Sequence, residues 1–177
     1  FTVYSSNYMN YLFDSTQSTS RTKMAIMHDA ASALLGSLSG VNIGLMRYDL
    51  NGNGGMVLAP IADIGTGTNR QDRINLINSW APSGSTPLSE TQYESYLYFS
   101  GSKVNFGNNS TTSTCSSWSA TGQCNSYTKT AAPSVGSSRV GGLVTSSNYD
   151  SPADYSCRQN FLVYLTDGLP NEKDQAN

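Results

Sequence analysis

Residues 41–64, VNIGLMRYDLNGNGGMVLAPIADI, contain two apolar runs on either side of a short polar segment. The runs at 41–48 and 55–64 have the length of strands and are bounded by glycine, asparagine and aspartate, which favour turns. The stretch therefore predicts two adjacent strands joined by a tight turn. The polar segment also matches the opening of an EF-hand calcium loop, but Pro60 occupies the position of that loop's final glutamate. We interpret the segment as a hairpin turn.

Helical patterns lie on both sides of this hairpin. Apolar residues recur at helical spacing from 21 to 38, after serines suited to capping and before a glycine, which predicts an amphipathic helix. A shorter helix is predicted at 70–80. A third helix is predicted to begin with Thr86 as its N-cap and Pro87 as its first residue. The side chains of this helix expected to face the core are Tyr93, Tyr96, Leu97 and Phe99.

The stretch NFLVYLTDG at 160–168 completes the pattern. Its apolar run, 161–165, is short and ends abruptly at polar residues, as strands that are buried on both faces do. The order helix, strand, strand, helix, helix, strand predicts an α/β sheet covered by helices, in a single domain that spans 1–177. Asp167 then lies at the carboxyl end of a central strand, where ligands bind in open α/β sheets.

Residues 102–148 interrupt this pattern, because they are rich in serine, threonine, glycine and asparagine and show weak periodicity. We expect a long inserted, loop-like excursion. Cys115, Cys124 and Cys157 lack the spacing and the histidine partners of a zinc site, so we predict a disulfide formed in an oxidising compartment. The simplest pairing joins Cys115 to Cys124 within the insertion; a bond from either of them to Cys157 is the alternative.

Composition argues against several classes of function. The formal net charge is −2 and the lysines and arginines do not cluster, so we expect no binding of nucleic acid. No apolar run approaches the roughly 18 to 20 residues that cross a bilayer, so no membrane span is expected in this chain. The single histidine, His28, lies inside the first predicted helix without a serine or cysteine motif, which disfavours a Ser/His/Asp hydrolase.

Asp167 and Thr86 have the most direct chemical interpretation. A carboxylate at the end of a buried strand needs a cation or hydrogen-bond donors to offset the cost of its burial. The alternatives are that Asp167 accepts backbone N–H bonds in a turn and that Thr86 only caps a helix. A further alternative makes Asp167 the nucleophile of a phosphoryl-transfer hydrolase. It is disfavoured because Leu169 stands where such chemistry needs a second acid or hydroxyl.

Several unusual blocks occur in order along the chain, leaving out only about 102–147. The blocks are SSNYMNYLF (5–13), SGVNIGLMRYD (39–49), GGMVLAPIADI (54–64), GSTPLSETQYESYLYFSG (84–101) and YDSPADYSCRQNFLVYLTDGLPN (149–171). Together they resemble the von Willebrand A region of the PilY-type tip-associated proteins of type IV pili. The resemblance implies a von Willebrand A-like fold, which is a Rossmann-type open sheet flanked by helices.

The resemblance also implies a site and a function. In this family a metal-ion-dependent adhesion site (MIDAS) combines an Asp-x-Ser-x-Ser loop after the first strand, a threonine from a second loop and an aspartate from a third. Thr86 matches the threonine and Asp167 the aspartate. Such hard oxygen ligands suit Mg²⁺, with Mn²⁺ or Ca²⁺ as alternatives.

A non-enzymatic module for adhesion and pilus biogenesis is therefore expected at the extracellular pilus tip, on the bacterial cell surface, after export through the periplasm. Its expected partners are minor pilins and a host or surface ligand. The alternative function is a structural spacer at the pilus tip with a degenerate metal site.

The chain departs from the family at the first metal loop. Its closest string to Asp-x-Ser-x-Ser is Asp14, Thr16 and Ser18, which follows the NYMNYLF block, whereas the family's loop precedes such a block. We interpret these residues as a loop leading to a helix cap, with metal binding as the alternative. The first loop is then expected upstream of Phe1. The domain is expected to be incomplete, and metal binding by this chain alone to be weak or absent.

Overall fold

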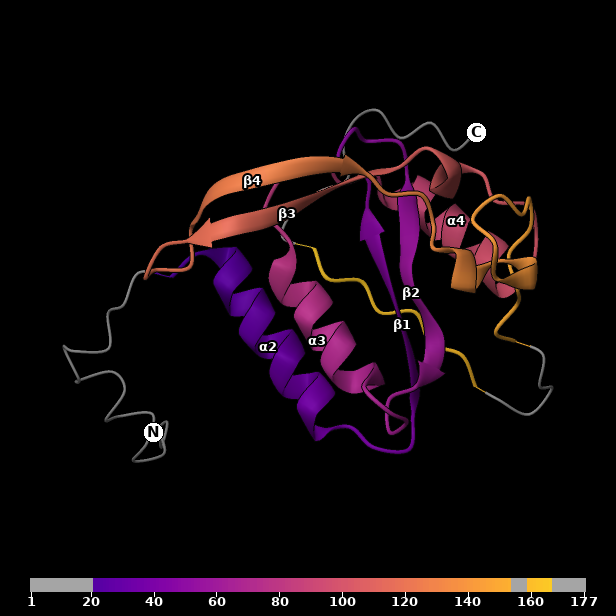
Figure 1. The fold of residues 1–177 in the computed structure, drawn as a ribbon, viewed down its shortest axis with the longest axis horizontal. Helices are drawn as coiled ribbons and strands as arrows, with labels where there is room; N and C mark the ends of the chain where they lie inside the picture. Colours follow the sequence, from indigo (N-terminus) through magenta and orange to yellow (C-terminus); the bar gives the residue numbers. More distant parts are fainter. Residues whose placement is uncertain (1–20, 154–158, 167–177) are drawn as a thin grey trace, which may run out of the picture.

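The structure is a computed structural model that describes residues 21–153 and 159–166. Those residues form a mixed α/β fold with three α-helices and two antiparallel two-stranded sheets (Figure 1). In chain order the elements are α2 (Lys23–Ser37), β1 (Asn42–Tyr48), β2 (Gly55–Asp63), α3 (Asn69–Ser79), α4 (Leu88–Phe99), the 3-10 helix η2 (Phe106–Asn108), β3 (Thr111–Trp118), β4 (Cys124–Ala131), and the 3-10 helices η3 (Gly136–Ser138) and η4 (Val140–Gly142). No helix in the described part of the chain is long and apolar enough to span a membrane.

The predicted hairpin is confirmed. β1 and β2 pair antiparallel, with Tyr48 opposite Gly55 at the turn. Asp49 is fully buried, and its carboxylate accepts the backbone N–H groups of Asn51 at 2.9 Å and Asn53 at 3.2 Å inside the turn. The same carboxylate accepts the N–H of Thr111 at 2.5 Å, where β3 begins. Asp49 is therefore satisfied by backbone donors, which supports the turn interpretation over a calcium loop.

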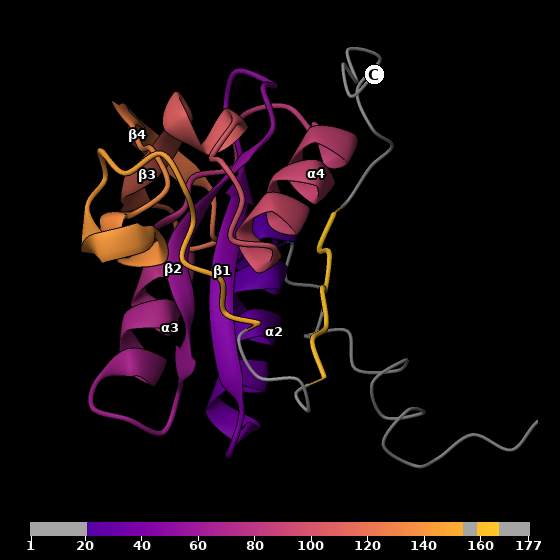
Figure 2. The same cartoon turned by 90° about the vertical axis from the view of Figure 1, so that its right-hand side faces the viewer.

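Helices cover both faces of this hairpin. On one face, Ala31 and Leu35 of α2 and Ile77 of α3 form a buried cluster against β1. On the other, Leu97 and Tyr98 of α4 pack with side chains of β2 and of the segments that follow α4. Figure 2 shows α3 and α4 on opposite sides of the two strands, and Figure 1 shows α2 and α3 side by side. The sheet thus forms the middle of three layers.

Helix α4 turns a largely polar face inward, and the expected core position of two of its tyrosines was wrong. Tyr93 and Tyr96, expected in the core, are 46% and 63% exposed, and their rings stack on each other at the surface. Leu97 is buried as expected, and Phe99 is half-buried. The inward positions that apolar spacing did not indicate belong to Glu90, Thr91, Glu94, Ser95 and Tyr98.

Glu94 has a structural reason to be buried. Its carboxylate accepts the backbone N–H groups of residues 105–107 at 3.2, 2.9 and 3.1 Å and the hydroxyl of Tyr149 at 2.7 Å. The guanidinium of Arg139 donates to the carbonyl of Gly107 at 3.1 Å. The backbone of residues 105–107 is therefore hydrogen-bonded to the Glu94 carboxylate through its N–H groups and to Arg139 through a carbonyl. A Cβ on Gly107 would lie 2.3 Å from the Ser134 hydroxyl, so only glycine fits here. This network attaches the segment after α4 to the helix.

The expectation of a loop-like insertion is partly wrong. Within it, β3 and β4 form an antiparallel hairpin, whose polar, weakly periodic sequence concealed its strands. The predicted Cys115–Cys124 disulfide is confirmed. Cys157 lies outside the described residues. The hairpin turn meets the start of α2, because the Thr22 hydroxyl donates to the carbonyl of Gly122 at 2.6 Å.

The predicted central strand at 161–165 is not a strand in the described structure. Residues 159–166 are extended but pair with no strand, and Phe161 and Val163 are 76% and 77% exposed. The segment runs along the α4 side of the sheet (Figure 2). An apolar run forms a buried strand only where a neighbour supplies backbone hydrogen bonds, and the described residues offer none here.

Replacing Glu94 by alanine should lower the free energy of unfolding by about 3 to 5 kcal/mol, because three backbone donors and a tyrosine hydroxyl lose their buried acceptor. Urea unfolding followed by circular dichroism measures this. Gln92→Ala is the control, since Gln92 is exposed on the same helix. A Glu94→Ala protein as stable as Gln92→Ala would contradict the assigned role.

Candidate functional site

Of the predicted metal ligands, only Thr86 lies among the described residues. Asp167 and the weaker candidates Asp14, Thr16 and Ser18 lie outside them. In the described ranges, no three histidine, cysteine, aspartate or glutamate side chains gather as a metal-binding group would. The part of the site that the structure describes is therefore the surroundings of Thr86.

Thr86 does not cap helix α4, so that alternative was wrong. The helix begins at Leu88, its N-cap residue is Pro87, and no side chain caps it. The backbone carbonyl of Thr86 accepts the N–H of Leu88 at 2.9 Å, and the residue is half-buried. The hydroxyl of Thr86 therefore makes no capping hydrogen bond to the first turn of α4.

The loop that carries Thr86 crosses the carboxyl end of β1. Gly84 has a φ of +112°, and a Cβ there would lie 3.0 Å from the Cα of Leu50. Glycine is therefore required both by the backbone conformation and by the close approach. One residue later, Ser85 lies against Gly52 in the β1–β2 turn. Thr86 follows directly, so it is held close to the end of β1.

Arg47 holds the base of this loop. Its guanidinium donates to the carbonyl of Ala81 at 2.8 Å and to the carbonyl and hydroxyl of Ser113 at 2.7 and 2.9 Å. It also lies over the ring of Trp80, 5.5 Å from the centroid. Burial lowers the pKa of Arg47 to about 10, so the side chain remains charged at neutral pH. Arg47 therefore links three parts of the fold: strand β1, the loop that follows α3, and strand β3.

Tyr164 lies near the same end of β1. Tyr164 lies near Tyr48, the last residue of β1, and beside Ser95 of α4. Burial raises the pKa of both tyrosines. The Tyr48 hydroxyl is buried without a hydrogen-bond partner in the described part of the chain. The Tyr164 hydroxyl instead has the Ser95 side chain as a hydrogen-bonding neighbour, which opposes the rise in its pKa. The buried, unpartnered hydroxyl of Tyr48 indicates that a further polar partner belongs beside it.

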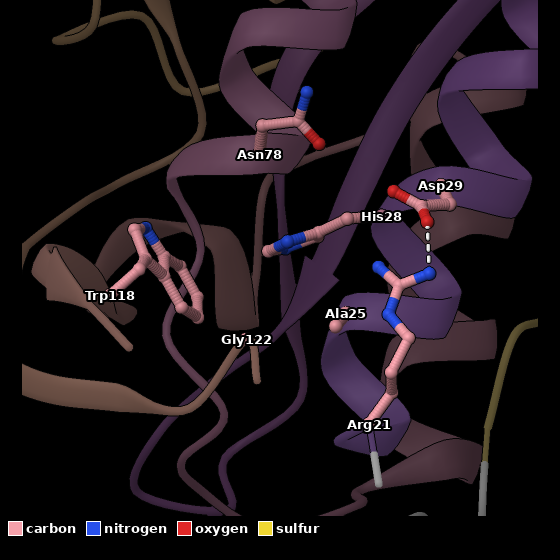
Figure 3. A pocket seen from close by; sticks show the side chains of 7 residues that line it. All are labelled: Arg21, Ala25, His28, Asp29, Asn78, Trp118 and Gly122. Carbon is pink, nitrogen blue, oxygen red and sulfur yellow. Dashed lines mark ion pairs between the residues drawn. The ribbon is translucent and has the colours of Figure 1, made fainter. Parts of the chain in front are cut away.

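A second candidate site is an open cavity of about 290 Å³ between α2, the end of α3 and the β3–β4 turn. The sequence did not predict this cavity, because its lining residues lie in three segments that are far apart along the chain. Figure 3 shows His28 between Trp118 on one side and the Arg21–Asp29 ion pair on the other. The remaining lining residues are Ala25, Asn78 and Gly122.

His28 forms the inner wall of this cavity. Its ring meets that of Trp118 edge to face, with centroids 5.3 Å apart and an interplanar angle of 83°. Burial lowers the pKa of His28, while Asp29 and the backbone carbonyls of Ile77 and Trp80 oppose that shift. The imidazole is therefore neutral at neutral pH.

Comparisons with known proteins identify no relative. Neither a protein-family model nor a curated protein nor a solved structure matches this chain.

Acidification should destabilise the protein through His28. Its pKa lies below the unfolded value of 6.5, so the folded state favours the neutral ring. The stability that His28 contributes is present above about pH 6.5 and is lost as pH falls toward the folded pKa. Thermal unfolding at about pH 8 and 5 should therefore show a larger loss for the wild type than for His28→Phe, which keeps an aromatic ring. Equal losses in the two proteins would refute the assignment.

Proposed function

We propose that this chain is part of a von Willebrand A-like domain of a PilY-type type IV pilus tip protein, which binds ligands through a divalent-metal site. The observation that carries the proposal is the meeting of three segments at the carboxyl end of β1. They are that strand end, the loop of Thr86, and the segment of Tyr164, which precedes Asp167 by three residues. The proposed site would bring the hydroxyl of Thr86 and the carboxylate of Asp167 together at this end of the sheet.

The open edge of β1 supports an additional strand in the complete protein. β1 pairs with β2 on one side, and within the described ranges no strand pairs with its other side. The unpartnered hydroxyl of Tyr48 lies at the end of this edge. We propose that a strand upstream of Phe1 occupies the edge and ends in the Asp-x-Ser-x-Ser loop that this chain lacks.

Helix α2 supports the same conclusion from another direction. Beyond the face that packs on α3, it carries a second apolar stripe made of Ile26, Ala30, Ala33 and Leu34. Ile26 and Leu34 are each 56% exposed, although positions i, i+4 and i+8 of a helix lie on one face. A surface helix with two apolar faces is expected to pack against a second element. The proposed strand would supply that element.

The chemistry of the site follows from its oxygen ligands. Thr86 would contribute a neutral hydroxyl and Asp167 a carboxylate, and the upstream loop the remaining oxygens. When bound, Mg²⁺, or Mn²⁺ or Ca²⁺ in its place, would offer an open coordination position to a ligand's carboxylate. Because the described residues contribute one of these ligands, we propose that metal affinity in this chain alone is weak or absent.

We propose that the module acts in adhesion and pilus biogenesis and catalyses no reaction. Its proposed location is the pilus tip at the bacterial cell surface, reached through the periplasm. Its proposed partners are minor pilins and a host or surface ligand. A phosphoryl-transfer role for Asp167 stays disfavoured by Leu169. The second candidate function is a structural spacer at the pilus tip with a degenerate metal site.

Metal binding by the full-length protein tests the proposal. Saturating Mg²⁺ or Mn²⁺, at about 100 times the dissociation constant, should stabilise the wild type by about 2.7 kcal/mol. Asp167→Ala and Thr86→Ala should lose most of this stabilisation, and Thr86→Ser should keep it because the hydroxyl remains. Thermal unfolding with and without metal measures the effect.

Two exposed residues away from the site provide controls, Asp150→Ala and Thr128→Ala. Both should respond to metal as the wild type does. An unchanged metal response in Asp167→Ala would remove Asp167 from the site, and no response in the wild type would favour the structural spacer.

A further inference from the structure

We propose that the cavity between α2, α3 and the β3–β4 turn binds a single uncharged sugar ring, such as a terminal hexose of a surface glycan. The site is separate from the proposed metal site. Its walls come from the start of α2, the end of α3 and the tip of the disulfide-bonded hairpin, whereas Thr86 lies in the loop between α3 and α4. The proposal of a sugar site and the proposal of a metal site can therefore be tested independently of each other.

The cavity is held in shape by contacts between the hairpin turn and α2. Thr22 donates its backbone N–H to the carbonyl of Thr121 at 3.3 Å and its hydroxyl to the carbonyl of Gly122 at 2.6 Å. Gly122 has a φ of +77°, and a Cβ there would lie 2.3 Å from the Cβ of Ala25. The disulfide from Cys124 constrains the same end of the hairpin. A pre-formed site loses little conformational entropy on binding.

One wall of the cavity is aromatic. Trp118 is half-buried, and the edge-to-face contact with His28 restricts its indole ring. The two rings lie opposite each other in Figure 3. A sugar ring has one face of C–H groups, and such a face packs on an indole ring without requiring hydrogen bonds from it. Trp118 is thus the expected platform.

On the far side of His28 from Trp118, the rim of the cavity is polar and contains both donors and acceptors. Arg21 Nη1 bonds Asp29 Oδ2 at 2.5 Å, which uses one of the five guanidinium N–H groups and one of the two carboxylate oxygens. The side chains of Arg21 and Asp29 are 44% and 64% exposed, so their remaining groups are accessible. The Asn78 amide adds a further donor and acceptor, and the Ser32 hydroxyl donates to its Oδ1 at 3.3 Å. Sugar hydroxyls need this mixture.

The charges in the cavity balance. The guanidinium of Arg21 and the carboxylate of Asp29 neutralise each other, and His28 is neutral at neutral pH. A charged ligand would lose solvation without gaining an unmatched partner of opposite sign, so an uncharged one is favoured. A volume of about 290 Å³ lies at the lower limit of ligand sites, which restricts the occupant to about one ring.

Ligand-observed NMR with methyl glycosides tests this proposal on the full chain. A panel of methyl glucoside, galactoside, mannoside and N-acetylglucosaminide should include at least one that binds with a dissociation constant on the order of millimolar, as expected for one small ring. The charged relatives glucosamine and methyl glucuronide should bind more weakly. Binding should be unchanged by EDTA and by Asp167→Ala, because no metal takes part.

Variants locate the binding. Trp118→Ala should weaken it by about tenfold or more. Asn78→Ala, at an exposed position that folding tolerates, should weaken it measurably. Tyr127→Ala is the matched control, since Tyr127 is 47% exposed on the neighbouring strand and does not line the cavity.

Three results would overturn the proposal. They are no binding of any glycoside at tens of millimolar, preferential binding of a charged sugar, and binding that survives both Trp118→Ala and Asn78→Ala.

Discussion

The half-buried guanidinium of Arg47 is the constraint on which the arrangement of the other elements depends. It extends from β1 and is satisfied by carbonyl and hydroxyl oxygens of the loop after α3 and of β3, with the Trp80 ring beneath it. A half-buried cation that lost one of these partners would carry an unmet desolvation cost. The loop after α3 and the β3–β4 hairpin are therefore fixed relative to the β1–β2 sheet. The path of that loop past the end of β1 sets the position of Thr86.

Polar side chains hold several segments of this fold together, where other proteins use apolar packing. Contacts of this kind leave no periodic pattern in the sequence, so the elements that depend on them were not predicted. The helices and the central hairpin were predicted because their apolar residues follow periods of 3.6 or 2. The inward face of α4 was not, since Glu94 is buried to satisfy backbone donors that lie eleven to thirteen residues along the chain. Such long-range pairings leave no periodic signal. For the same reason the serine- and threonine-rich strands β3 and β4 resembled a loop.

The candidate sites show the same division. Asp167 was expected at the end of a central strand and lies outside the described residues, while the structure places Tyr164, three residues earlier, near Tyr48 at the end of β1. The burial of 161–165 was also expected but is wrong for the described residues, because a strand's burial depends on neighbours that its own sequence does not contain. The cavity at His28 and Trp118 could not be predicted, since it exists only after residues 90 positions apart are brought together by folding.

The disulfide has a mechanical consequence for any chain that is pulled from its two ends. Cys115 and Cys124 are nine residues apart in sequence and belong to one hairpin. Under tension the bond withholds only about 30 Å of contour length, because an extended chain spans at most about 3.3 to 3.6 Å per residue. The crosslink therefore preserves the shape of the hairpin tip without limiting how far the rest of the chain extends. Resistance to force would rest on the hydrogen bonds between β1 and β2 and on the polar contacts of Arg47 and Glu94.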